Sequence, residues 1–263
     1  MYLESPLLTA AGFRHAFFTR QGGVSEGPFA SLNFSSALGD APENVAENLT
    51  RAAGALGVDP TRVYFLDQVH GAEVHALTSD DDRAAVLATQ GDALIAADPQ
   101  VACGVRTADC VPVLLACTSS GQVGAAHAGW RGAVAGIVPA TVRALRARGA
   151  QGPLIAAIGP HISLQAFEVS EDVAAQIQAA APGVPLLDRT LGPRPHANLR
   201  ELVRSQLLDL GVVQIDEVPG CTVSAPELFF SYRRDGRVGG RHLSAIVPRS
   251  PESLRPPSAP PTL

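Results

Sequence analysis

The run VPVLLAC at residues 111–117 restricts the fold most, because seven consecutive apolar residues must be shielded from water on every side. Its length is typical of a strand. Three neighbouring runs, GDALIAA, ACGVRT and QVGAAHAG, are also predicted to be short strands. We therefore expect a group of strands between residues 91 and 128, with residues 111–117 in a central position.

Helical patterns lie on both sides of this group. Residues 42–57 carry an apolar stripe that ends at Gly57, and Asp40 with Glu43 matches a capping box. Residues 198–211 begin at Asn198, a residue typical of helix N-caps. A third helix is expected after residue 132, and Pro139 predicts that it is kinked or begins late.

Strands and helices mix without the regular alternation of a Rossmann or barrel fold. We therefore predict an α/β or α+β class in one domain, residues 1–247, with a loop centred on RRDG (233–236) before the last strand. Residues 248–263 are rich in proline and serine without periodicity, and we expect a disordered tail.

The charge composition limits the partners and mechanisms. All 20 basic residues are arginines and the net charge is −5, without a basic cluster, which argues against a nucleic-acid or anionic-membrane partner. The lack of lysine excludes Schiff-base and P-loop chemistry, so an anionic substrate would need arginine, histidine, backbone N–H groups or a metal. The N-terminal residues lack a signal-peptide pattern and no apolar run could span a membrane, so we expect a cytoplasmic protein.

Three segments each end an apolar run with a potential metal ligand. They are DQVHG with His70, RTADC with Cys110 and AAHAG with His127. The three are far apart in sequence, so no local metal motif exists, and structural roles for each remain open. His75 and His161 are alternative candidates. None of the four cysteines forms a CxxC pair.

Six segments of this chain stand out together, in this order: TRQGGVSEGPFASLNFS (19–35), DQVHGAEV (67–74), GDALI (91–95), RTADCVPVLL (106–115), AAHAGWRGAVAGI (125–137) and IGPHISLQAFEV (158–169). They resemble the signature blocks of the YfiH family. Members of that family are labelled laccase-domain proteins, polyphenol oxidases, peptidoglycan editing factors and purine nucleoside phosphorylases. The resemblance implies a four-layer α/β/β/α domain and a Zn²⁺ ion bound by His70, Cys110 and His127, with copper as a possible substitute.

The resemblance also implies an activity. It implies phosphorolysis of adenosine, inosine, guanosine and methylthioadenosine, with adenosine deamination at the same centre, by a monomer or weak homo-oligomer. Purine nucleosides and phosphate would be the partners, and zinc would supply the activated water for deamination. One alternative is an amide hydrolase acting on peptidoglycan precursors, with Cys110 as nucleophile and His127 as base. A copper polyphenol oxidase is disfavoured, because the chain has seven histidines and no His-x-His.

Further residues are candidates for substrate contacts or catalysis. Arg20 and Asn33 belong to a glycine-containing segment that the resemblance places in a pocket-lining loop. Asp109 precedes Cys110 and is a candidate acid/base group or partner of a zinc-bound histidine. Arg131 is expected at a helix start, where either a bound anion or exposure to solvent would account for its charge. Trp130 is expected to pack the same turn rather than to wall a pocket.

Other positions have weaker assignments. Arg241 and His242 are expected on an exposed face. Ala37 and His161 replace the histidine and cysteine usual in the family, and Gln165-Ala166 replaces a cysteine-containing pair. These departures leave the three ligands intact but put roles at those positions in doubt.

Overall fold

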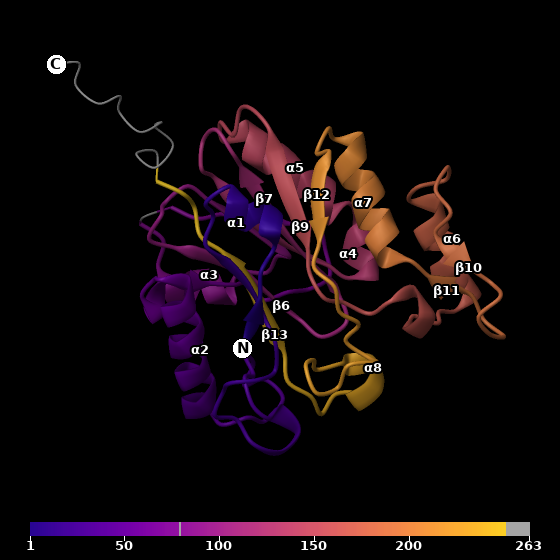
Figure 1. The fold of residues 1–263 in the computed structure, drawn as a ribbon, viewed down its shortest axis with the longest axis horizontal. Helices are drawn as coiled ribbons and strands as arrows, with labels where there is room; N and C mark the ends of the chain where they lie inside the picture. Colours follow the sequence, from indigo (N-terminus) through magenta and orange to yellow (C-terminus); the bar gives the residue numbers. More distant parts are fainter. Residues whose placement is uncertain (79, 251–263) are drawn as a thin grey trace.

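The computed structural model describes residues 1–78 and 80–250. Two β-sheets form its centre (Figure 1). The five-stranded sheet has the order β1 (Tyr2–Leu3), β2 (His15–Phe18), β13 (His242–Ile246), β6 (Ala102–Thr107) and β3 (Val63–Tyr64). The six-stranded sheet has the order β12 (Gln214–Glu217), β9 (Leu154–Ile158), β7 (Val111–Cys117), β8 (Val123–Ala128), β5 (Ala93–Ala96) and β4 (Val74–Ala76). A small hairpin pairs β10 (Leu187–Asp188) with β11 (His196–Ala197).

Five helices lie on the outer faces of the two sheets. In Figure 1, α2 (Pro42–Leu56) lies on one side of the domain, and α4 (Trp130–Ala135), α5 (Ile137–Ala147), α6 (Glu171–Ala179) and α7 (Leu199–Asp209) lie on the other. Three shorter helices are α1 (Pro6–Ala10), α3 (Arg83–Ala88) and α8 (Tyr232–Asp235). The domain is therefore a four-layer α/β/β/α structure, as the resemblance implied.

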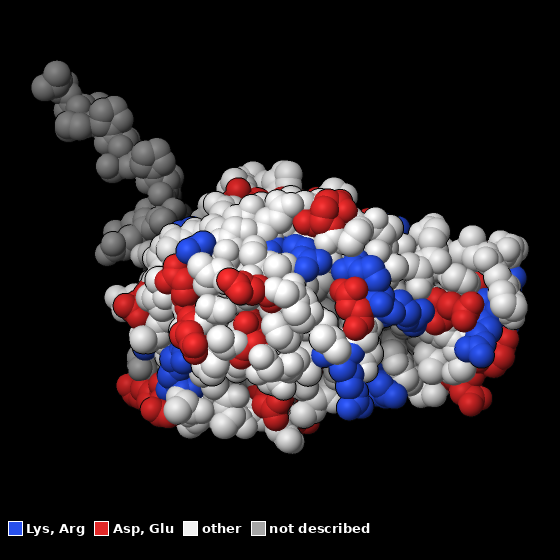
Figure 2. Space-filling model, turned by 90° about the horizontal axis from the view of Figure 1, so that it is seen from below, with Lys and Arg blue, Asp and Glu red and all other residues white. Residues whose placement is uncertain are grey.

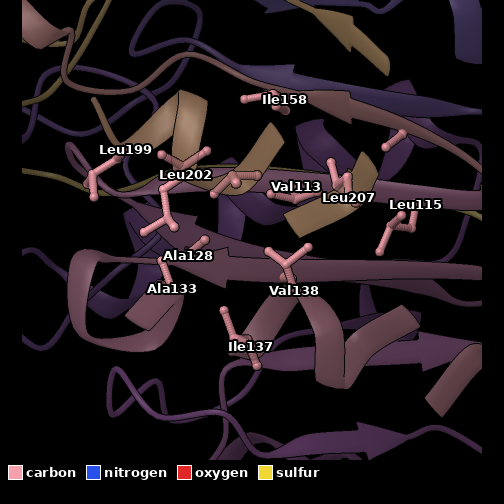
Figure 3. Packing of buried hydrophobic residues seen from close by; sticks show 14 of the residues in the cluster. Val113, Leu115, Ala128, Ala133, Ile137, Val138, Ile158, Leu199, Leu202 and Leu207 are labelled. Carbon is pink, nitrogen blue, oxygen red and sulfur yellow. The ribbon is translucent and has the colours of Figure 1, made fainter. Parts of the chain in front are cut away.

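Three hydrophobic clusters correspond to the three interfaces between these layers. One lies between the six-stranded sheet and helices α4–α7, where Val113 and Leu115 face Ile137, Val138 and Leu202 (Figure 3). The second lies between the sheets, and the third packs the five-stranded sheet against α2. Each strand between two such clusters is buried on both faces.

Strand β7 shows why its sequence has no polar residue. Val113 and Leu115 contribute to the cluster beneath the helices, while Leu114 and Ala116 point into the cluster between the sheets. All seven residues are buried, because β7 lies between β9 and β8 in the middle of its sheet. The predicted central position of residues 111–117 is confirmed.

The predicted helices are present, with differences at their ends. Asn198 caps α7 by accepting a hydrogen bond from the N–H of Glu201. The helix after residue 132 is divided at Gly136, which has φ of 88°, so that Pro139 lies in the first turn of α5. Two details were wrong: Asp40 does not cap α2, because its carboxylate binds Ser25 and Asn33, and residues 233–235 of RRDG belong to α8.

The C-terminal end of the described chain extends beyond the expected domain boundary at Val247. The Arg249 guanidinium donates to the carbonyls of Ala11 and Thr118, at 2.7 Å for Thr118, and its backbone N–H donates to Gly121. The rest of the expected tail, residues 251–263, lies outside the described residues.

Two surface properties bear on the expected partners. No helix in the described part of the chain is long and apolar enough to cross a membrane. On the face shown in Figure 2, basic and acidic side chains are interspersed rather than gathered in one extended basic surface.

The contacts of Arg249 predict different effects for two truncations. Removal of residues 251–263 should leave the melting temperature unchanged, whereas removal of residues 248–263 should lower it by several degrees. Hydrogen bonds from a charged group contribute about 1.5–3 kcal/mol in total to the free energy of unfolding. Each kcal/mol shifts the melting temperature of a domain of this size by about 2–4 °C. Differential scanning calorimetry of both variants measures this. Equal melting temperatures would contradict a stabilising role for Arg249.

Candidate active site

The three candidate ligands come together because of strand register. Strands β7 and β8 are antiparallel, and Pro112 pairs with His127. Cys110, two residues before Pro112, therefore lies at the same end of the sheet as His127. His70 reaches this place from the loop between β3 and β4. The ligand atoms of His70, Cys110 and His127 all lie within 4.8 Å of one another.

The geometry of this cluster fits a small metal ion. The Cys110 Sγ is 3.8 Å from the His70 Nε2, and the two imidazole rings meet edge to face with centroids 4.8 Å apart. Gly129 makes this approach possible, because a Cβ there would lie 2.7 Å from the His70 ring and 3.0 Å from the Cys110 Sγ. One thiolate and two imidazoles form a donor set suited to Zn²⁺, and three protein ligands leave a fourth position open.

Asp92 holds two of these ligands in place. Its fully buried carboxylate accepts a hydrogen bond of 2.8 Å from the His127 Nδ1. It also accepts bonds from the backbone N–H groups of His70 at 3.0 Å and Gly71 at 2.6 Å. With Nδ1 occupied, His127 presents Nε2 to a metal. Sequence analysis assigned no role to Asp92, although it lies in the GDALI segment quoted for the resemblance.

The electrostatics of the cluster favour a deprotonated thiol. Burial alone would raise the pKa of Cys110, but the charge and hydrogen bond of His127, with those of His70, lower it to about 6. Burial would lower the pKa of His127, but Cys110 and Asp92 raise it to about 9. Without a metal, Cys110 and His127 thus form a thiolate–imidazolium pair, and a bound cation would take the place of the proton.

A cleft of about 580 Å³ opens beside the cluster. Four arginines contribute to its wall, together with three aromatic residues and the acidic residues Asp67 and Asp109. The four arginines are Arg106, Arg131, Arg233 and Arg241, and the aromatic residues are Trp130, Phe167 and Tyr232. An arginine-rich and partly aromatic cleft suits an anionic group next to a flat ring.

Two of the arginines lie deep in the cleft. Burial lowers the pKa of Arg106, and Asp67 opposes this shift, while the nearby charge of Arg241 adds to it. Burial likewise lowers the pKa of Arg241. Neither guanidinium makes an ion pair with a carboxylate in the described part of the chain. Two neighbouring guanidinium groups that are removed from water and have no carboxylate partner favour the binding of an anion between them.

The other two arginines lie at the edge of the cleft. The Arg131 guanidinium stacks on the Trp130 ring at 4.5 Å, and that of Arg233 lies 5.3 Å from the Phe167 ring. Arg131 is exposed at the start of α4, as expected. Trp130 both packs against the helix-side core and lines the cleft, so the expectation that it only packs a turn was incomplete.

Asp109 lines the cleft but does not contact the histidine ligands through its carboxylate. One carboxylate oxygen accepts from the Thr222 hydroxyl at 2.5 Å and the other from the Arg233 N–H at 2.6 Å. Asp92, rather than Asp109, is therefore the partner of His127. Asp109 and His70 are the two non-glycine residues with positive φ in the described chain, at 89° and 62°. Such strained backbone is typical of functional sites.

Two predicted substrate contacts lie outside the cleft wall. The Arg20 guanidinium donates to the carbonyls of Ala30 and Pro226. Asn33 is fully buried and its Oδ1 accepts from the N–H of Arg241, so it positions a cleft residue without lining the cleft. Both side chains thus hold loops in place, and their assignment as substrate contacts stays a prediction.

The remaining candidate residues lie in different surroundings. His75 pairs with Asp81, and His161 lines a different cavity. His242 is buried and its Nε2 accepts from the N–H of Phe230. The expectation of an exposed face at Arg241 and His242 was therefore wrong: Arg241 lines the cleft, and the loop before β13 turns it inward.

Comparison with known proteins agrees with this architecture. Residues 14–249 match the family described as multi-copper polyphenol oxidoreductase laccase. The chain is 39% identical over 225 residues to the purine nucleoside phosphorylase YfiH of Escherichia coli, covering 84% of this chain and 88% of that protein. The chain belongs to the YfiH family.

Other members of the YfiH family are also similar along nearly their whole length. A purine nucleoside phosphorylase of Deinococcus radiodurans is 43% identical over 249 residues, covering 93% of this chain and 94% of that protein. The crystal structure of YlmD from Geobacillus stearothermophilus has a TM-score of 0.84 and 35% identity, covering 91% of this chain and 93% of that chain.

The departures from the usual YfiH family pattern lie away from the ligand cluster. Ala37 does not line the cleft, and His161 and Gln165 line a second cavity. A multicopper centre needs more ligands than the single His/Cys/His cluster found in the described residues.

Removal of a ligand should remove the metal. We expect about one zinc per purified chain and little zinc in Cys110→Ala, because two ligands cannot complete the site. Elemental analysis measures this, and Cys221→Ser is the matched control that should keep its zinc. Undiminished zinc in Cys110→Ala would contradict the ligand set, and several coppers per wild-type chain would favour the oxidase.

Neutralising Asp92 should weaken metal binding without removing a ligand. In Asp92→Asn, the carboxylate that orients His127 and the loop of His70 is lost, and loss of such a partner typically costs about 10- to 100-fold in metal affinity. Competition with a zinc-chelating dye gives this affinity. An affinity equal to wild type in a folded variant would show that Asp92 only stabilises the fold.

Proposed function

We propose that this chain is a zinc-dependent purine nucleoside phosphorylase that acts on adenosine, inosine, guanosine and methylthioadenosine, and that it deaminates adenosine at the same centre. The observation that carries the proposal is one cleft with three metal donors, four arginines and three aromatic side chains. The names of relatives of about 40% identity support the phosphorylase part of this proposal.

The arginines account for the phosphate. Phosphate is a dianion near neutral pH and needs several charge-assisted hydrogen bonds. Arg106 and Arg241 lie deep in the cleft without carboxylate partners, and Arg131 is at the edge with its guanidinium exposed. We assign phosphate to the deep pair, with Arg131 as an additional contact. Since the chain has no lysine, the cationic side chains available in the cleft are arginines and histidines.

The aromatic side chains account for the purine. Trp130, Phe167 and Tyr232 line the cleft, and the first two carry stacked arginines. A purine ring has a flat face that stacks on such groups. We place the base along this aromatic side of the cleft.

Asp109 is suited to act next to the sugar. In phosphorolysis a phosphate oxygen bonds to C1′ as the bond from C1′ to the purine nitrogen breaks, and the sugar gains positive charge. The Asp109 carboxylate is held in the cleft by Thr222 and Arg233, and its negative charge would stabilise that sugar. Zn²⁺ held by His70, Cys110 and His127 would supply Lewis acidity at its open coordination position.

The direct test is product analysis with adenosine. Phosphorolysis gives adenine and ribose 1-phosphate only when phosphate is present, whereas deamination gives inosine with or without phosphate. Chromatography of both reactions with zinc-loaded protein separates the two activities. Absence of adenine at saturating phosphate would overturn the phosphorylase proposal.

A specific observation supports a second candidate, amide hydrolysis. Cys110, His127 and Asp92 follow the order of a nucleophile, a base and an orienting carboxylate, and the pKa of the thiol is lowered. This reaction would require the metal-free protein, because a thiolate bound to zinc is a poor nucleophile. Hydrolysis of muropeptide amides by metal-free protein, lost on zinc addition, would favour this candidate.

Substitution of the cleft arginines should weaken phosphorolysis more than deamination, because only phosphorolysis needs bound phosphate. In Arg241→Gln and Arg131→Gln, the loss of a charge-assisted hydrogen bond should weaken apparent phosphate affinity about 10- to 150-fold, with the larger effect at Arg241. Inosine formation and zinc content should change much less. Arg143→Gln, exposed on α5, is the matched control. Equal loss of adenine and inosine would recast both arginines as structural.

A further inference from the structure

A second cavity of about 340 Å³ lies beside the active-site cleft and shares no wall residue with it. Its wall includes His161, Ser163, Arg200, Glu217 and Cys221. Arg200 and Glu217 form an ion pair of 3.1 Å. The volume is sufficient for a small organic molecule, and the wall is largely polar.

Two short chain segments separate this cavity from the cleft. His161 and Cys221 form a parallel β-bridge, supported by bonds from the His161 N–H to the Gly220 carbonyl and from the Thr222 N–H to the His161 carbonyl. In an extended segment, the side chains of consecutive residues point to opposite sides of the chain. His161 and Cys221 line the second cavity, whereas Ile162 lines the cleft and Thr222 binds Asp109.

Cys221 differs from the other three cysteines, all of which are also free thiols. Cys103 and Cys117 are fully buried, and Cys110 belongs to the ligand cluster. Cys221 is partly exposed. Burial alone would raise the pKa of its thiol, but hydrogen bonds from Ser163 and Ser224 lower it to about 7. A substantial fraction of Cys221 is therefore thiolate near neutral pH.

The neighbouring imidazole adds a polar contact on the same wall. The His161 Nδ1–H donates to the Gly159 carbonyl at 2.8 Å. Its Nε2 has no hydrogen-bond partner among the described residues and remains available as an acceptor. Thiolate, imidazole and the Ser163 hydroxyl thus border one cavity.

We propose that Cys221 is a site of reversible thiol–disulfide exchange with a small polar disulfide that enters this cavity. The Cys221 thiolate attacks one sulfur of the disulfide, and a new S–S bond forms as the old one breaks. The other half leaves as a thiolate and takes a proton from water. Cys221 is oxidised and the departing half is reduced, so the electrons balance.

The adduct acts on the cleft through the separating wall. Because Cys221 and Thr222 are adjacent in the chain, an attached group that shifts this segment weakens the bond from Thr222 to Asp109. Asp109 then loses one of its two fixed contacts in the cleft. This regulatory consequence rests on the proposed function, whereas formation of the adduct does not.

The adduct is tested with zinc-loaded protein and 2-hydroxyethyl disulfide. Peptide mapping by mass spectrometry should locate a mixed disulfide on Cys221 that dithiothreitol reverses, with zinc content unchanged. Ser224→Ala, which removes an exposed hydroxyl, should slow the reaction about 3- to 10-fold, because each pKa unit changes the thiolate fraction up to tenfold. No adduct, or an adduct confined to other cysteines, would overturn the proposal.

The regulatory consequence is tested by comparing Cys221→Ser with wild type. Phosphorolysis by the wild type should fall several-fold after exchange and return with dithiothreitol, while Cys221→Ser should have normal activity that the disulfide does not change. An adduct without loss of activity would refute the coupling through Thr222. If neither protein forms adenine before treatment, the proposed function fails while the mass result still decides the adduct.

Discussion

The candidate active site depends on one buried carboxylate. Asp92 is fully buried, and a buried charge is tolerated only when hydrogen bonds compensate for its lost hydration. It obtains these bonds from His127 and from backbone N–H groups at His70 and Gly71. The same bonds connect the loop of His70 to the end of β5 and β8. The hydrogen bonds that compensate this one buried charge therefore place two of the three candidate metal donors.

The cleft combines chemistry from both sheets. Cys110 immediately precedes β7 and His127 lies in β8, so both are at one end of the six-stranded sheet. Arg106 lies on β6 and Arg241 precedes β13, and both strands belong to the five-stranded sheet. Because the sheets pack face to face, their ends meet at one opening. The candidate metal donors and the cationic side chains thus line one cleft, although they come from different layers of the domain. This arrangement suits the proposed reaction between a nucleoside and an anion.

The wall between the cleft and the second cavity explains how the Cys221 thiol would influence the proposed reaction. Extended segments alternate the direction of their side chains, so the adjacent residues Cys221 and Thr222, the partner of Asp109, face opposite sides of this wall. Asp109 also has a positive φ and two hydrogen bonds that fix its carboxylate. A strained residue held by few contacts is sensitive to movement of any of them.

The sequence by itself determined the elements and the donor types. Apolar runs of strand length predicted β7 and its neighbours, an apolar stripe predicted α2, and the Asn198 cap predicted α7. The resemblance pointed to His70, Cys110 and His127 as candidate metal donors. Only the tertiary structure placed Asp92 and Arg241 at the candidate site and showed that Arg20 and Asn33 do not line the cleft. The physical reason is that these roles depend on contacts between residues far apart in the chain. Local patterns record which side chain is present and whether it is buried, but strand register and loop packing decide what it faces.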